Sequence, residues 1–177
     1  MRIRLLGTVL LIAAVLAILL ASEAHAARSW TGGCTVAVDI TPTAQDLYGR
    51  EIANALATVT LVTGLTFEPA TDNADLTYQI GDTSWLGPDV LGYFDYDANA
   101  VTLLPVIPAQ YVGQKPAKRA NVRARLLLHE TLHWLGLDHD ESWESIMQPI
   151  VTEAPAVMDS ADFSRVRAAG LANGCKA

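Results

Sequence analysis

The chain has 177 residues, 12 of them basic and 19 acidic, which gives a formal net charge of −7. This length suits a leader segment followed by one ordinary domain with a sizeable core. A chain this acidic has no general electrostatic attraction to nucleic acid or to anionic lipid, so we expect neither as a partner.

The first 26 residues have the pattern of a secretory signal. Two arginines precede an apolar run over 5–21, and Ala-His-Ala at 24–26 offers small residues at the two positions that a signal peptidase reads. An uncleaved anchor is the alternative, because about 17 apolar residues is the lower limit for spanning a bilayer. We expect cleavage after residue 26, which leaves a secreted monomeric domain over 27–177 with no stable membrane association.

The first half of this domain predicts strands and one long helix. Residues 34–40 alternate apolar and polar types, as a strand does. A helix is predicted over 41–65, with Thr41 as N-cap, Pro42 in its first turn and Gly64 at its end. Further strands are predicted at 66–70, 74–81, 92–99 and 100–107.

The second half predicts helices. A loop is expected over 108–116, a helix over 117–135, and a last helix over 160–172 with Ser160 as its cap and Phe163 facing the core. The order of elements predicts one mixed α/β domain whose last third lacks strands. The basic residues within 115–125 have no aromatic residues among them, which favours a solvated helix start over a binding patch.

The mature domain would contain two cysteines, Cys34 and Cys175. In an exported protein an even pair predicts a disulfide, and two free thiols are the alternative. Closing a loop of this length would stabilise the fold by roughly 4–5 kcal/mol in the chain-entropy model.

The stretch HETLHWLGLDH at 129–139 has the spacing of a metal site. His129 and His133 are four residues apart and therefore share one face of a helix. Gly136 suits a helix end, after which the chain can return His139 to the same ion. Glu130 lies about 100° round the helix from His129, at the margin of the site, where it suits a general base.

An amphipathic helix with ordinary surface histidines is the alternative interpretation. Removal of the leader takes away His25, so every histidine of the mature domain occupies a ligand position. Three neutral imidazoles with an open fourth position are typical of a catalytic zinc site. We therefore expect zinc as the cofactor.

The pattern His-Glu-x-x-His-x-x-Gly-x-x-His resembles the long zinc signature of the metzincin metallopeptidases. Ser145-Ile146-Met147 is similar to the Met-turn of that clan, in which the methionine forms an apolar floor beneath the metal ligands. A loop methionine that fills a gap in the core is the alternative for Met147.

Within this clan the run from the zinc helix to Pro149 looks like the matrixins. That resemblance implies an α+β catalytic domain with a twisted five-stranded mixed sheet, three helices and a zinc cleft between an upper and a lower subdomain. It also implies a zinc-dependent endopeptidase that acts on protein or peptide substrates. The segment 92–98 is our candidate for the edge strand that binds substrate, with an ordinary hairpin as the alternative. A zinc hydrolase of non-protein amides and a non-catalytic zinc- or peptide-binding protein are the other functions considered.

The sequence departs from the matrixin pattern in several places. It has no cysteine segment for thiol-switch latency and no histidines left for a second, structural zinc. Residues 150–152 replace the tyrosine expected shortly after the Met-turn, so the resemblance says nothing about substrate preference.

Two sets of acidic residues have open roles. One acid near the third ligand could orient a zinc-bound imidazole, although a solvated acidic loop is the alternative. The second set lies where matrixins hold structural calcium, but its members lack the regular ligand spacing of a calcium-binding loop. The first set is Asp138, Asp140, Glu141 and Glu144, and the second is Asp89, Asp95 and Asp97.

Overall fold

A computed structural model describes residues 33–87, 89–112, 116–150 and 152–176. The expected leader over 1–26 lies outside this part. Within the described part, none of the helices combines the length and the hydrophobicity needed to cross a bilayer. In chain order the elements are β1 Thr35–Ile40, α2 Pro42–Thr63, β2 Thr66–Pro69, β3 Leu76–Ile80, η1 Ser84–Leu86, β4 Gly92–Asp95, β5 Ala100–Leu103, α3 Ala109–Val112, α4 Pro116–Trp134 and α5 Ser160–Ala172.

The five strands form one mixed sheet in the order β2-β1-β3-β5-β4. Neighbouring strands run parallel except for β4, which is antiparallel to β5. Three long helices, α2, α4 and α5, accompany the sheet, together with the short α3. The expected α+β fold with a five-stranded mixed sheet is therefore confirmed, and β4 is an edge strand.

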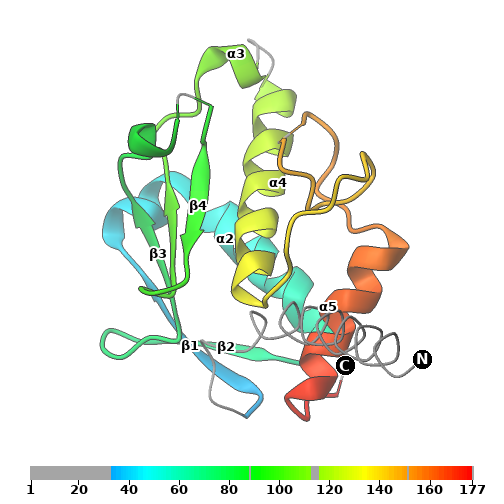
Figure 1. The fold of residues 1–177 in the computed structure, drawn as a ribbon. Helices are drawn as coiled ribbons and strands as arrows, with labels where there is room; N and C mark the ends of the chain where they lie inside the picture. The colour runs from blue at the N-terminus through cyan, green and yellow to red at the C-terminus, as the bar shows by residue number, and fades with distance from the viewer. Residues whose placement is uncertain (1–32, 88, 113–115, 151, 177) are drawn as a thin grey trace, which may run out of the picture.

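The helices α2 and α4 pack against each other and against the strands, and α5 packs against α2 (Figure 1). Figure 1 shows β3 and β4 on the left with α4 alongside them, and α5 on the opposite side of α4 from these two strands. Tyr78 of β3 and Thr131 of α4 connect the sheet to α4 by a buried hydrogen bond of 2.8 Å. The largest fully buried apolar side chains of this core include Tyr48, Ile52, Leu76, Tyr78, Leu126, Leu132, Ile146 and Met147.

The start and end of α2 follow from the residues that predicted them. Thr41 accepts a hydrogen bond from the backbone N–H of Ala44, and Pro42 is the first helical residue. Gly64 ends the helix in the left-handed conformation, with φ 74°.

Three predictions in the second half are corrected. The segment 108–116 is not a plain loop, because Ala109–Val112 forms the short helix α3. The cap of α5 is Asp159 rather than Ser160, because Asp159 and Asp162 form a reciprocal capping box. Phe163 is 44 % exposed, so the prediction that it faces the core is wrong, and Asp162 beside it is fully buried instead.

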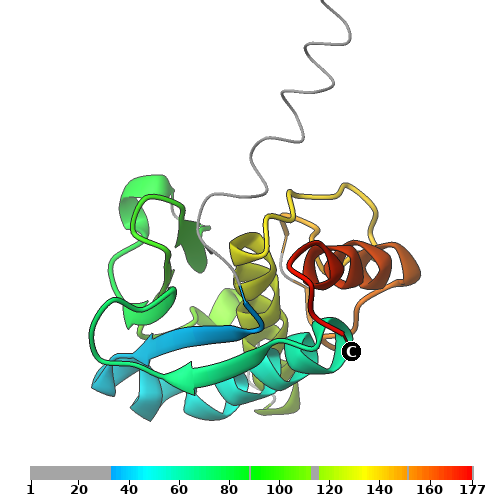
Figure 2. The ribbon, with the colours of Figure 1, turned by 90° about the horizontal axis from the view of Figure 1, so that it is seen from below.

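The C-terminal helix is attached to the rest of the fold at its far end. Cys34 and Cys175 form the predicted disulfide, with their Cα atoms 5.4 Å apart. Gly170 of α5 packs on Thr63 at the end of α2 so closely that an added Cβ would lie 2.6 Å from the Thr63 carbonyl oxygen. Figure 2 shows α5 beside the C-terminal part of α2.

Candidate metal centre

The helix α4 positions the first two histidines. It is buried along most of its second half, where it packs between the sheet and the segment that follows it. His129 is 4 % exposed, and His133 lies one turn later on the same face. The helical spacing predicted for these two ligands is therefore present.

The third histidine reaches the site through a Schellman-type helix end. Gly136 adopts φ 84° and donates its N–H to the His133 carbonyl at 2.9 Å, and Leu137 donates to the Leu132 carbonyl at 3.1 Å. This reversal directs the chain back along α4, which brings His139 to the two helical ligands. The role predicted for Gly136 is confirmed.

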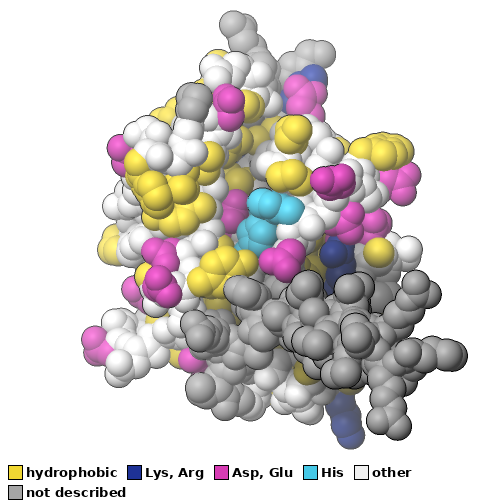
Figure 3. All heavy atoms as spheres, viewed as in Figure 1, with side chains coloured by type: hydrophobic (Ala, Val, Ile, Leu, Met, Phe, Trp, Pro, Cys, Tyr) yellow, Lys and Arg dark blue, Asp and Glu magenta, His cyan; other side chains and the backbone are white. Residues whose placement is uncertain are grey.

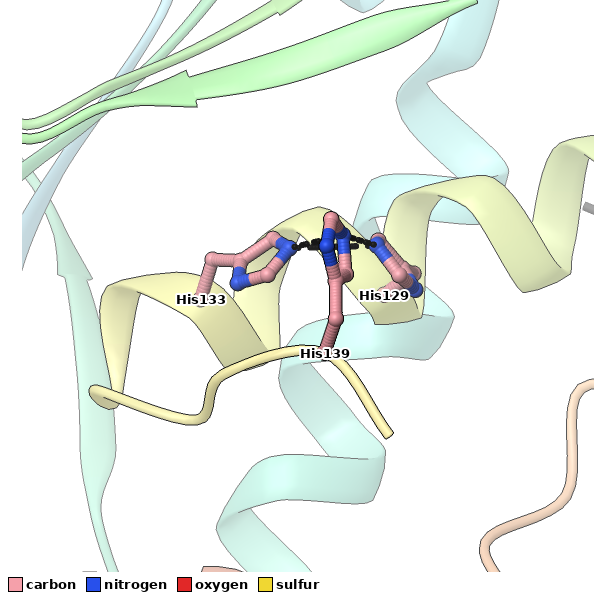
Figure 4. Close-up of side chains that lie close together, drawn as sticks. All are labelled: His129, His133 and His139. Carbon is pink, nitrogen blue, oxygen red and sulfur yellow. Dashed lines mark hydrogen bonds between the residues drawn. The ribbon is translucent and has the colours of Figure 1, made fainter. Parts of the chain in front are cut away.

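The three Nε2 atoms converge on one point (Figure 4). They lie 3.1 Å (His129–His133), 3.2 Å (His133–His139) and 3.3 Å (His129–His139) apart. Tetrahedral coordination with Zn–N bonds of about 2.0–2.1 Å places ligand nitrogens about 3.3 Å apart. The cluster therefore has the dimensions of a metal site. Among the described residues, these three histidines form a group whose ligand atoms lie close enough together to hold one metal ion.

The hydrogen-bond partners of the Nδ1 atoms show which nitrogen of each ring is free to bind a metal ion. Nδ1 of His129 lies 2.8 Å from the Ile146 carbonyl oxygen, and Nδ1 of His133 lies 2.7 Å from that of Leu137. A carbonyl only accepts, so each Nδ1 carries the hydrogen and each neutral ring directs the lone pair of Nε2 inward. Lone pairs that face one another do not form hydrogen bonds, whereas a cation satisfies all of them.

Burial keeps these imidazoles neutral. It lowers the pKa of His129 to about 3, with a smaller contribution from the neighbouring His133. Burial also lowers the pKa of His133. Metal ions bind neutral imidazole, so these two rings need no deprotonation at neutral pH.

Glu130 and the histidines line an open cleft of about 800 Å³. Glu130 is 5 % exposed, and burial raises the pKa of its carboxyl to about 8. A dication among the histidines would favour its charged form. On the face in Figure 3, histidine side chains reach the surface between hydrophobic and acidic ones. Other residues that line the cleft include Leu91, Gly92, Tyr93, Phe94, Tyr96, Leu126 and Ile150.

The predicted Met-turn is buried and is connected to the first ligand through its backbone. Ser145, Ile146 and Met147 each have 0 % exposure. The Ile146 carbonyl accepts the hydrogen bond from His129, and the Ile146 N–H donates to the Asp162 carboxylate at 2.7 Å. Ser145 Oγ donates to the other oxygen of Asp162 at 2.9 Å and accepts from the Met147 N–H. The turn that orients His129 is therefore held by α5.

Sequence reasoning missed two residues that support the turn, Asp162 and Arg125. Arg125 lies one turn before His129, is 2 % exposed, and donates to the Ser145 and Pro155 carbonyls. Burial lowers the pKa of its guanidinium, and the charge of Asp162 opposes that shift. An aspartate at the third position of a predicted helix is a capping-box signal that could have identified Asp162.

The acids of the 138–144 segment do not orient the two helical ligands, and the second acidic set does not form a cation site among the described residues. The Nδ1 atoms of His129 and His133 bond to backbone carbonyls instead of to the acids of the 138–144 segment. Asp89, Asp95 and Asp97 do not form a three-ligand group in the described part of the chain. Asp89 accepts a hydrogen bond from Tyr111, and Asp95 accepts two from the backbone of its own turn.

Three of the basic residues in 115–125, Lys118, Arg123 and Arg125, form contacts within the molecule. Lys118 pairs with Glu153, and Arg123 pairs with Glu51 and lies 4.2 Å from the centre of the Tyr48 ring. These partners agree with the prediction that this stretch is not a binding patch.

No protein-family model matches the sequence, and a search of curated proteins finds no relative. The site is therefore interpreted from its own geometry: a three-histidine group able to hold a metal ion, with a buried glutamate beside it in an open cleft.

Proposed function

We propose that the protein is a secreted zinc-dependent endopeptidase of the metzincin clan, similar to the matrixins. The observation that carries the proposal is the combination of three convergent Nε2 atoms and the buried Glu130 carboxyl at the same cleft. A site that only binds a metal needs no acid–base group beside an open coordination position. The disulfide supports export to an oxidising compartment.

The proposed division of labour follows from the positions of the side chains. His129, His133 and His139 would hold zinc, and two of them are fixed in orientation by their backbone carbonyl partners. Zinc, when bound, would supply a Lewis acid that activates water and polarises the scissile carbonyl.

Glu130 would move the proton. Its carboxylate would accept a proton from the attacking water and would later donate it to the nitrogen of the leaving amine. Its position supports this role, because the carboxyl is buried at the same cleft as the three histidines, next in sequence to the first of them.

The substrate would bind as an extended peptide beside β4. Residues Gly92, Tyr93 and Phe94 of this strand line the cleft, and β4 has a single neighbour in the sheet. An edge strand offers backbone groups to which a peptide can add as a further strand. This arrangement favours a polypeptide over a small amide.

The test uses the mature chain over 27–177 with its disulfide intact and one equivalent of zinc. It should cleave denatured proteins or a peptide library. Glu130→Gln should bind zinc as wild type does and lose about 10²–10⁴-fold in kcat/KM. Glu144→Gln, the same change at an exposed position near the site, is the matched control and should cleave normally. If the zinc-loaded wild type cleaves no peptide, the proposed peptidase activity is excluded. If Glu130→Gln is as active as wild type, Glu130 is not the general base.

A further inference from the structure

One arginine of α5 connects the two ends of the segment that follows the third ligand. Nη2 of Arg165 lies 2.9 Å from Oδ2 of Asp140 and 2.7 Å from Oδ1 of Asp162. This nitrogen carries two hydrogens, so it can donate to both carboxylates at once. The two carboxylates come from different segments, Asp140 directly after His139 and Asp162 from α5.

Each of these carboxylates is already attached to part of the metal centre. Asp162 accepts from the Ile146 N–H, and the Ile146 carbonyl orients His129. Asp140 is the next residue after His139, and its N–H donates to the Met147 carbonyl at 3.0 Å. Arg165 therefore connects the support of one ligand to the backbone of another.

His139 depends on such a support more than the other two ligands do. It lies beyond the end of α4, so no helical hydrogen bonds hold its backbone, and its residue is exposed. Asp140 is fixed on one side by the Met147 carbonyl and on the other by Arg165. Removing the guanidinium would leave the segment after His139 with fewer restraints and two carboxylates without their shared cation.

We propose that Arg165 is a positioning residue for the metal centre, which holds His139 in place through Asp140 while it braces the Met-turn through Asp162. The inference rests on the metal site of the proposed function, although not on peptidase activity. Partners of metal ligands commonly change metal affinity by about 10–100-fold when they are removed.

The test compares Arg165→Gln with Arg167→Gln in the mature domain. Arg167 lies on the same helix, is exposed, and has the same charge, so it is the matched control. Zinc affinity is measured by competition with a chelator, and the geometry of the site by the visible absorption spectrum of the Co²⁺-loaded protein. We expect Arg165→Gln to weaken zinc binding by about 10–100-fold and to alter the Co²⁺ spectrum, and Arg167→Gln to change neither.

Asp140→Asn tests the same contact from the loop. It should reproduce the part of the loss that passes through Asp140, and the double variant should lose no more than Arg165→Gln alone, because Arg165→Gln already removes the contact with Asp140. If Arg165→Gln does not fold, the zinc affinity of Asp140→Asn still tests whether the Arg165–Asp140 contact supports the metal centre. Zinc affinity and a Co²⁺ spectrum that match wild type in the Arg165 and Asp140 variants would overturn the proposal. A wild-type domain that binds no zinc would instead refute the metal centre, and this role with it.

Discussion

Replacing Asp162 by asparagine should destabilise the domain more than any exposed change of the same kind. The carboxylate is fully buried and accepts four hydrogen bonds, from Ser145 Oγ and Arg165 on one oxygen and from the N–H groups of Ile146 and Asp159 on the other. The new amide has one acceptor and one donor group. Whichever way it is turned, its NH₂ faces a group that can only donate.

The size of the effect follows from those contacts. A lost hydrogen bond to a charged group costs about 1.5–3 kcal/mol, and the buried guanidinium of Arg125 also loses the charge that opposes its desolvation. Breaking a buried charge interaction from one side typically costs about 3–5 kcal/mol. We therefore expect the free energy of unfolding to fall by about 3–5 kcal/mol, a large share of the total for a domain of this size.

The assay is urea denaturation of the metal-free domain at pH 7, followed by circular dichroism, with the disulfide intact. Asp46→Asn, at an exposed position of α2, is the matched control and should change stability by less than about 0.5 kcal/mol. If Asp162→Asn unfolds within about 1 kcal/mol of wild type, the carboxylate is not the anchor of the Met-turn and the reasoning above is wrong.

Three further predictions concern packing, pH and metal removal. Gly170→Ala should lower the unfolding free energy by about 1–3 kcal/mol, because the added Cβ would overlap the backbone of Thr63. Gly49→Ala is the control and should be tolerated, because its added Cβ would meet only the flexible end of the Gln45 side chain. Equal denaturation midpoints for the two variants would contradict the prediction. The metal-free Glu130→Gln domain should lose stability as the pH falls from about 6.5 toward 3, because over that range the unfolded chain protonates His129 and the folded one does not. In the wild type Glu130, whose pKa the fold raises from 4.5 to about 8, offsets this loss above about pH 4.5, so a flat profile of the variant would exclude a buried neutral His129. Chelation of the metal should abolish peptide cleavage and lower the thermal midpoint, and added zinc should restore both; a midpoint that is independent of zinc would show that the folded state does not bind it.

The parts of the fold that sequence predicted are those with local causes. The start and the end of α2 are set by contacts within one turn of the chain, made by Thr41, Pro42 and Gly64. The limits of the helix could therefore be inferred from the sequence to within two residues. The spacing of His129 and His133 similarly determines their common face on α4, because helix geometry alone relates them.

The parts that sequence missed depend on contacts between distant segments. Arg125 is 20 residues from the Ser145 carbonyl to which it donates, and Asp162 is 16 residues from Ile146. No periodicity marks such pairs, and an arginine in a helix predicts a solvated side chain. The cap of α5 was misplaced by one residue because Asp159 and Ser160 are both good caps, and only the capping box with Asp162 distinguishes them.

The disulfide has a kinetic consequence for the metal centre. Because Cys175 is bonded to Cys34, α5 is tethered at both ends, by the chain that precedes it and by the bond that follows it. When α5 detaches for a moment, its effective concentration at its own binding surface stays in the millimolar range or above, so that re-docking is fast compared with an untethered helix. The turn at 145–147 then regains its carboxylate partner quickly. Reduction of the disulfide would leave α5 tethered at one end only, so that the support of the His129 ring would be restored more slowly after each fluctuation.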